Sequence, residues 1–209
     1  MSAEHPARDT PSVTDDFCDD PCLERRAVNA ALPLRDRWAR AETFEHLLER
    51  VTINRELWQA LASRATVAPS AIERARALPG RWHLLVLTED WCGDSVNTLP
   101  VLARLVAGAP NLEMRLLGRD ENPDIMNSHL SRGSRSIPVV MLLDDDFVER
   151  GWWGSRPGPL QQWVVGTGLP LSREERYREV RKWYARDHGA TAVDEMLSLL
   201  ERGATRHLP

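Results

Sequence analysis

The sequence predicts an α/β sandwich, in which helices cover both faces of a central sheet. Three apolar runs, residues 82–87, 112–117 and 137–143, have the length and composition of buried strands. Helical patterns follow the first two runs, and a turn joins the third run to another short strand at 147–152. This order of elements gives two parallel strands and a closing antiparallel hairpin.

Composition indicates a folded, soluble protein and excludes two classes of partner. The chain has 209 residues, of which 42% are hydrophobic and 28% charged, and its net charge is −4. Such a small negative charge does not favour binding to nucleic acid or to a membrane surface. No apolar run approaches the roughly 20 residues that span a bilayer, and residues 1–6 do not resemble a secretory signal. Three cysteines make a poor disulfide framework, so we expect a cytoplasmic protein.

Residues 1–36 are rich in Pro, Asp, Ala and Arg and predict a mobile N-terminal arm. Cys18 and Cys22 lie within this arm. We interpret them as incidental cysteines; the alternative is a labile disulfide, or a thiol that resolves a disulfide elsewhere. A zinc site is not expected, because no pair of His or Cys residues follows at the required spacing.

Helices are predicted on both sides of a core domain at 81–168. Residues 37–80 form an N-terminal helical extension, in which apolar residues recur at helical spacing and Pro69 begins the last helix. Residues 169–209 form a C-terminal helical extension that starts at the capping box Ser172–Glu175. The apolar residues expected on one side of its first helix are Tyr177, Val180, Trp183 and Tyr184.

The segment Thr88–Ser95 (TEDWCGDS) joins the first strand to the helix that follows it. It places Cys92 at the start of that helix, where free backbone N–H groups and the helix dipole favour an anion. A thiol at such a position ionises more readily, and the thiolate is the reactive form. Cys92 is therefore the candidate nucleophile.

Charged residues near Cys92 act on its pKa in opposite directions. Arg132 and Arg135, in the loop before residue 138, would lower it by favouring the thiolate. Three carboxylates of the turn would raise it: Glu89, Asp90 and Asp94. From the helix start and the arginines we expect a moderately acidic thiol. The alternatives are a cysteine buried as a small hydrophobe, a solvated Arg135, and an Asp94 that only balances the helix dipole.

Four sequence blocks resemble the thioredoxin superfamily, in particular a bacterial thioredoxin-like group with a Glu-Asp-Trp-Cys-Gly-Asp signature. They are TEDWCGDSVNTLP (88–100), RDENPD (119–124), GSRSIP (133–138) and WGSRP (153–157), within a similarity that covers about residues 41–166. The resemblance implies a thioredoxin-like three-layer α/β/α sandwich with a mixed sheet and extra helices at both ends.

The resemblance also implies roles for single residues. Trp91 and Cys92 match the tryptophan and the attacking cysteine of thioredoxins, and Pro100 matches the proline that kinks the active-site helix. Pro138 matches the proline that faces the cysteine, so the Ile137–Pro138 peptide bond is predicted to be cis. In relatives, the backbone before this proline receives an extended substrate peptide.

The sequence departs from the thioredoxin pattern at two positions. Ser95 replaces the second cysteine of Cys-x-x-Cys, so no disulfide can form within the motif, and Val86 stands where many thioredoxins carry a buried acid. A monothiol route remains, in which the Cys92 thiolate attacks a protein disulfide or a glutathionylated thiol and an external thiol reductant releases it. Ser95 would donate a hydrogen bond to the thiolate without resolving the mixed disulfide.

The candidate site has three catalytic residues, Cys92, Ser95 and Pro138, and four that bind substrate: Trp91, Gly93, Ile137 and Arg135. No metal or cofactor is expected. Two alternatives remain open. One is a non-catalytic binding module that uses the groove at Pro138 and the added helices. The other is iron–sulfur or glutathione handling, suggested by the Cys-Gly-x-Ser form of monothiol glutaredoxins, although no glutathione-carboxylate motif follows Pro138.

Overall fold

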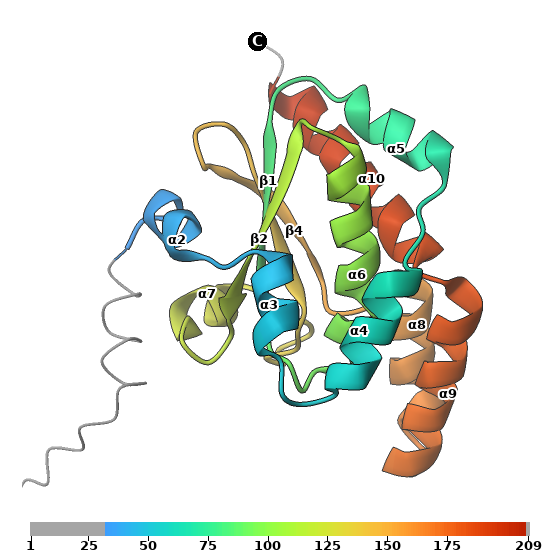
Figure 1. Ribbon diagram of the computed structural model, residues 1–209. Coiled ribbons are helices and arrows are strands. Elements are labelled where there is room, and N and C mark those ends of the chain that lie inside the picture. The colour runs from blue at the N-terminus through green and yellow to red at the C-terminus, as the bar shows by residue number, and fades with distance from the viewer. Residues whose placement is uncertain (1–31, 208–209) are drawn as a thin grey trace, which may run out of the picture.

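The computed structural model describes residues 32–207, and Cys18, Cys22 and most of the predicted N-terminal arm lie outside this range. The described residues form the predicted three-layer sandwich, in which a mixed four-stranded sheet lies between two layers of helices (Figure 1). The order of the strands in the sheet is β2-β1-β3-β4. Helices precede and follow the strands, as the sequence predicts.

In chain order the strands are β1 (Trp82–Thr88), β2 (Leu112–Gly118), β3 (Val139–Leu143) and β4 (Glu149–Gly154). β1 pairs parallel with β2 and antiparallel with β3, and β3 and β4 form the predicted hairpin. Every residue of β1 is buried, as expected for a strand covered on both faces. β4 begins two residues later than predicted. The Asp144 carboxylate prolongs the turn, because it accepts the N–H groups of Asp146 (3.0 Å) and Val148 (2.9 Å).

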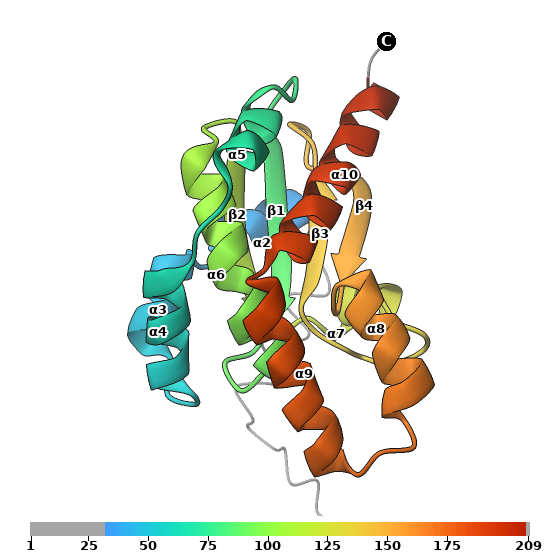
Figure 2. The ribbon, with the colours of Figure 1, turned by 90° about the vertical axis from the view of Figure 1, so that its right-hand side faces the viewer.

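Alternate residues of β1 face two separate cores, because side chains alternate along a strand. Leu84 and Val86 face the core of the first helical layer, and Leu85 and Leu87 face the core of the second. The helices of the first layer that cover the sheet are α6 (Gly93–Gly108) and α10 (Ala190–His207), which cross the same face in Figure 2. The second layer consists of α2 (Leu34–Arg40) and α7 (Pro123–Ser128).

The N-terminal helices belong to the same packed body as the sheet. Beside α6 lie α3 (Phe44–Arg50), α4 (Arg55–Arg64) and α5 (Pro69–Arg76) (Figures 1 and 2). Phe44, Leu47, Val51 and Trp58 from α3, α4 and their connection are part of the core that α6 and α10 share. On the opposite face, α2 starts at Leu34, which is inside the predicted arm, because its Trp38 packs in the second core.

The chain returns to the end of the sheet through α8 (Gly158–Trp163), a π-helical turn (Val164–Gly168) and α9 (Arg173–Asp187). Ser172 and Glu175 form the predicted capping box of α9. Only Tyr184 of this helix is buried, so the predicted apolar side does not pack as a whole into the core. Figure 2 shows the reason: α9 extends past the end of the sheet, where it has no strand to cover.

Candidate active site

Cys92 lies where β1 ends and α6 begins, at the position that the sequence predicts for the nucleophile. Its sulfur accepts a hydrogen bond from the Ser95 N–H (Sγ–N distance 3.4 Å), and its thiol donates to the carbonyl oxygen of Ile137 (3.3 Å). The Ile137–Pro138 peptide bond is cis, as predicted. The cis-proline segment and the cysteine are therefore in direct contact, although they are far apart in the sequence.

Gly154 explains part of the fourth sequence block. It pairs with Val139 in the hairpin and has a φ of +156°. A Cβ atom at this position would lie 2.4 Å from the carbonyl oxygen of Pro138. Only a glycine allows β4 to approach the cis-proline segment this closely.

An open cavity of about 840 Å³ borders Cys92. The size is in the range of small-molecule sites, and the walls come from α4, the Trp91–Gly93 turn, the start of α6, the loop before Pro138 and α9. The Trp91 side chain lines the cavity and is 44% exposed. The extension after residue 168 thus supplies one wall of the cavity.

Two acids of the signature fix the turn that carries Cys92. The Glu89 carboxylate accepts the backbone N–H of Asp120 (3.1 Å), which ties the turn to the end of β2. The Asp90 carboxylate accepts the backbone N–H groups of Thr52 and Ile53, both at 3.2 Å. Trp58 of α4 donates its indole N–H to the Asp90 carbonyl oxygen (2.9 Å). These two acids therefore position the turn.

Asp94, the third acid, belongs to a buried cluster beside Cys92. Its carboxylate pairs with the Arg156 guanidinium (2.6 Å) and accepts the phenolic O–H of Tyr184 (3.0 Å). Burial raises the pKa of Asp94, although Arg156 acts in the opposite direction. Burial, and then the charge of Asp94, raise the pKa of Tyr184. Sequence reasoning missed this cluster, although Asp94 and Arg156 both belong to the quoted blocks.

The fold and the site geometry agree with a family comparison. A family model described as thioredoxin matches residues 41–185, which include all four described strands and most of the helix α9. The chain belongs to this thioredoxin family.

Two solved structures share the thioredoxin-like fold. A protein of unknown function from Pseudomonas aeruginosa, PA1234, is 22% identical with a TM-score of 0.61, over 78% of this chain and 94% of that chain. An HIV epitope scaffold is 21% identical with a TM-score of 0.61, over 80% of this chain and 96% of that chain. At these identities the two structures establish the fold alone. No curated protein matches the chain.

In this thioredoxin-family protein Cys92 is more buried than the sequence implies. Cys92 is only 6% exposed, and burial raises the pKa of its thiol above the ordinary value. Hydrogen bonds with Ser95 lower that pKa, and the charge of Asp94 raises it further. The expectation of a moderately acidic thiol is wrong in direction, because the desolvation of Cys92 outweighs the effect of the helix start.

Four of the other predicted site residues line the cavity next to Cys92: Trp91, Gly93, Ile137 and Arg135. Arg132 does not line the cavity. Arg119 does line it, and its guanidinium carbon lies over the Trp91 ring, 4.8 Å from the ring centroid. Ser95 is fully buried beside Cys92, and both its side chain and its N–H lower the pKa of the thiol.

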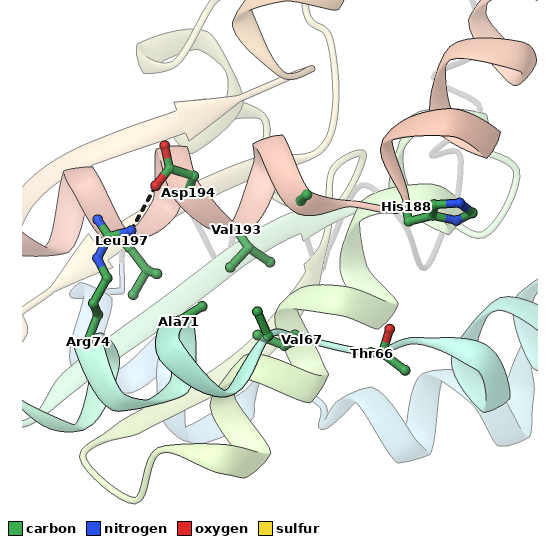
Figure 3. Close-up of a pocket in the computed structure, with 10 residues that line it drawn as sticks. Thr66, Val67, Ala71, Arg74, His188, Val193, Asp194 and Leu197 are labelled. Carbon is green, nitrogen blue, oxygen red and sulfur yellow. Dashed lines mark hydrogen bonds and ion pairs between the residues drawn. The ribbon is translucent and has the colours of Figure 1, made fainter.

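A second, smaller cavity of about 260 Å³ lies between α5, with the segment before it, and the start of the helix α10 (Figure 3). Its lining is mainly small and aliphatic, with an ion pair between Arg74 and Asp194 (2.8 Å) at one end. The residues that line it include no cysteine and none of the predicted site residues.

Residues 32–207 hold no group of three side chains that suits a metal ion. Among the helices that the structure describes, none is long and apolar enough to cross a membrane.

Proposed function

We propose that this protein is a monothiol thiol–disulfide oxidoreductase that acts through Cys92. The observation that carries the proposal is the contact between the Cys92 sulfur and the Ile137 carbonyl, at the edge of an open cavity. A peptide that replaced the thiol as partner of this backbone would bring its own sulfur to Cys92. The substrates are protein disulfides or glutathionylated thiols, and the setting is cellular redox homeostasis.

The reaction proceeds by two thiol–disulfide exchanges. The Cys92 thiolate attacks one sulfur of the substrate disulfide, the S–S bond breaks, and the other sulfur leaves as a thiolate that takes up a proton. An external thiol then attacks the Cys92 mixed disulfide and regenerates Cys92. The external thiol supplies the electrons, because Ser95 cannot form the second bond that a dithiol motif would make.

The raised pKa of Cys92 makes this exchange slow and selective. A higher pKa reduces the thiolate fraction tenfold per unit, while the intrinsic nucleophilicity rises only about threefold. Reaction with disulfides in general is therefore slow. A substrate that fills the cavity and brings a favourable charge to the thiolate restores the rate.

The decisive experiment is the reduction of a glutathionylated peptide by the full chain, with glutathione as the external thiol. Cys18→Ser and Cys22→Ser are introduced together to isolate Cys92. We expect turnover that is lost in the additional variant Cys92→Ser, and a trapped Cys92 mixed disulfide in the mass spectrum when no external thiol is added. Turnover that survives the loss of Cys92 would refute the proposal.

One observation favours a second function, a non-catalytic binding module. A buried thiol with a raised pKa and no second cysteine in the motif also suits a residue that only packs. In that case Cys92→Ser retains full biological activity, whereas a substitution that fills the cavity, such as Gly93→Trp, abolishes it. Gly93 is the appropriate position, because a Cβ atom added there would meet no described atom within 4 Å.

A further inference from the structure

The cavity beside Cys92 has an excess of positive charge that disulfide exchange does not itself require. Five arginines line it, against the carboxylates of Asp94 and Glu174: Arg119, Arg135, Arg156, Arg173 and Arg181. Arg156 is paired with Asp94 (2.6 Å) and Arg119 with Asp120 (2.9 Å). Within residues 32–207, no carboxylate forms an ion pair with any of the other three arginines.

The three arginines without a carboxylate come from two different walls. Arg135 lies in the loop that leads to Pro138, next to the backbone that contacts Cys92. Arg173 and Arg181 lie on α9, on the helix face that also presents Tyr177 and Val180 to the cavity. Their spacing of eight positions places them about 12 Å apart along the helix axis. All three are exposed, so they are accessible to a ligand.

This arrangement suits a short peptide that has a carboxylate near each end and a sulfur between them. A guanidinium binds a carboxylate through two parallel hydrogen bonds, which makes arginine the residue of choice for such groups. Three extended residues span at most about 10 Å, close to the separation of the two arginines of α9. The exposed ring of Trp91 and the side chain of Tyr177 offer apolar surface for the peptide between its charged ends.

We infer that the cavity binds the glutathionyl group of a mixed disulfide, with Arg135, Arg173 and Arg181 as carboxylate ligands. Glutathione is a tripeptide with two carboxylates and a central thiol, and it meets each requirement above. The inference rests on the proposed exchange function for its chemistry, but the binding step can be tested without any reaction.

The chemistry is balanced with glutathione as the only co-reactant. The Cys92 thiolate attacks the glutathione sulfur of the mixed disulfide, and the protein thiol leaves as a thiolate that takes up a proton. A second glutathione thiolate then attacks the same glutathione sulfur and releases Cys92. The products are the free protein thiol and glutathione disulfide, so glutathione is oxidised as the substrate is reduced.

The binding step is tested by calorimetry on the full chain with Cys92→Ser, which cannot react. The probe is S-methylglutathione, and the matched probe is the same tripeptide with both carboxyl groups amidated. We expect the amidated probe to bind at least tenfold more weakly, because a hydrogen bond to a charged group contributes more to binding than one between neutral groups. Equal affinities for the two probes would overturn the inference.

Substitutions assign the binding to the three arginines. Arg173→Gln and Arg181→Gln together, or Arg135→Gln alone, should weaken the binding of S-methylglutathione about tenfold. Arg186→Gln is the control, because Arg186 is on the same helix but outside the cavity lining, and it should leave the affinity unchanged. An equal loss with Arg186→Gln would mean a general charge effect and would refute the assignment.

The rate of mixed-disulfide formation separates this inference from the proposed function. With Cys92 present, glutathione disulfide should react at least tenfold faster than the neutral hydroxyethyl disulfide, and the arginine variants should lose that difference. A cysteine disulfide in an acidic protein segment that reacts faster than glutathione disulfide would overturn the tripeptide assignment. Failure of every disulfide to react, with binding of S-methylglutathione intact, would refute the proposed function and leave the binding site established.

Discussion

Among the charged neighbours of Cys92, Asp94 opposes ionisation of the thiol most directly. Its carboxylate raises the pKa of the thiol, and it is itself neutralised by Arg156 and held by Tyr184. The two effects are linked, because the guanidinium that satisfies Asp94 would otherwise favour the thiolate. After burial, the pKa of the thiol therefore depends on a pair that lies one step away from it.

Replacing Asp94 with Asn should lower the pKa of Cys92. The substitution removes a negative charge next to the sulfur and frees the positive charge of Arg156. It should also cost about 3 kcal/mol of unfolding free energy, because one partner of a buried ion pair is lost. The pH dependence of Cys92 alkylation measures the first effect and urea unfolding the second. An alkylation midpoint that stays in place would contradict the charge argument.

Ser95→Cys should create a working dithiol motif. Position 95 is fully buried next to Cys92, so a thiol at this position would lie beside the Cys92 sulfur. With Cys18 and Cys22 replaced by serine, oxidation should then remove two titratable thiols per chain, and the variant should reduce insulin with dithiothreitol. The parent chain, which has one thiol after the same replacements, serves as the control. Two thiols that resist every mild oxidant would contradict the expected proximity.

For single residues, the sequence predicts which residues lie at the site better than it predicts their burial and their partners. Cys92 and the cis proline follow from local motifs, and the structure brings Cys92 into contact with the cis-proline segment. The pKa of Cys92 depends on how much water reaches the sulfur, which no local pattern encodes. The partnership of Asp94 with Arg156 and Tyr184 joins three elements and is equally invisible before the chain is folded.

Two charged contacts attach α7 to its neighbours. As the pH rises, the stabilisation from the first contact increases and that from the second decreases. Arg37 of α2 binds the Asp124 carboxylate through two hydrogen bonds (3.0 and 2.6 Å). At the other end, His129 binds the Ile125 carbonyl (2.7 Å) and the Glu149 carboxylate (3.0 Å). The first contact joins α7 to α2, and the second joins it to β4.

Asp124→Asn should destabilise the protein at neutral pH but not in acid. Burial alone would raise the pKa of Asp124, but pairing with Arg37 lowers it, so the contact stabilises the fold above the ordinary pKa of about 4. That stabilisation is lost as the pH falls through the lowered pKa. The cost at neutral pH should be about 1 kcal/mol, because the Asp124 side chain is 39% exposed. Unfolding of both proteins at neutral pH and at about pH 2 tests this, and a constant difference would contradict it.

The contact between His129 and Glu149 should weaken as the pH rises. Burial alone would lower the pKa of His129, but its hydrogen bonds to Glu149 and Ile125 raise it. The stabilisation is therefore complete below the ordinary histidine pKa of about 6.5 and is lost as the pH rises through the raised value. Glu149→Gln should remove this pH dependence from the unfolding free energy. A wild-type stability that is flat from about pH 6 to pH 9 would contradict the prediction.

The helix α9 shows where sequence periodicity stops being informative. Its start is predictable, because the capping box is a local signal that the structure confirms. Its aromatic residues suggest a packed face, yet Tyr177 lines the cavity and is exposed. Whether an apolar side chain fills a core or borders a cavity depends on the element packed against it. Here α9 extends past the end of the sheet, so no strand packs against this part of the helix.

The whole chain from α3 to α10 is built around shared cores. Trp58 of α4 and Leu200 of α10 are both fully buried in the same core as β1 and β3. The strand order and the helical layers follow from apolar runs and turn signals, so the architecture is predictable from the sequence. The boundaries at 80 and 168 mark changes of pattern, and the core continues across both of them.

Unfolding should consequently be a single cooperative transition. Trp58→Ala in the N-terminal extension and Leu200→Ala in the C-terminal extension should each lower the unfolding free energy by about 2–5 kcal/mol and leave one transition. Circular dichroism and tryptophan fluorescence should report the same midpoint in urea. Two separated transitions in either variant would mean that the helical extensions unfold on their own.

The burial of Cys92 also bears on its survival under oxidative stress. Peroxide oxidises thiolates that are exposed, first to sulfenic acid and then irreversibly. A thiol that is 6% exposed and whose pKa is raised by burial offers peroxide little thiolate to attack. With serine at position 95, no neighbouring thiol in the motif could rescue a sulfenic acid at Cys92. The same desolvation that raises the pKa of the thiol protects it from irreversible damage.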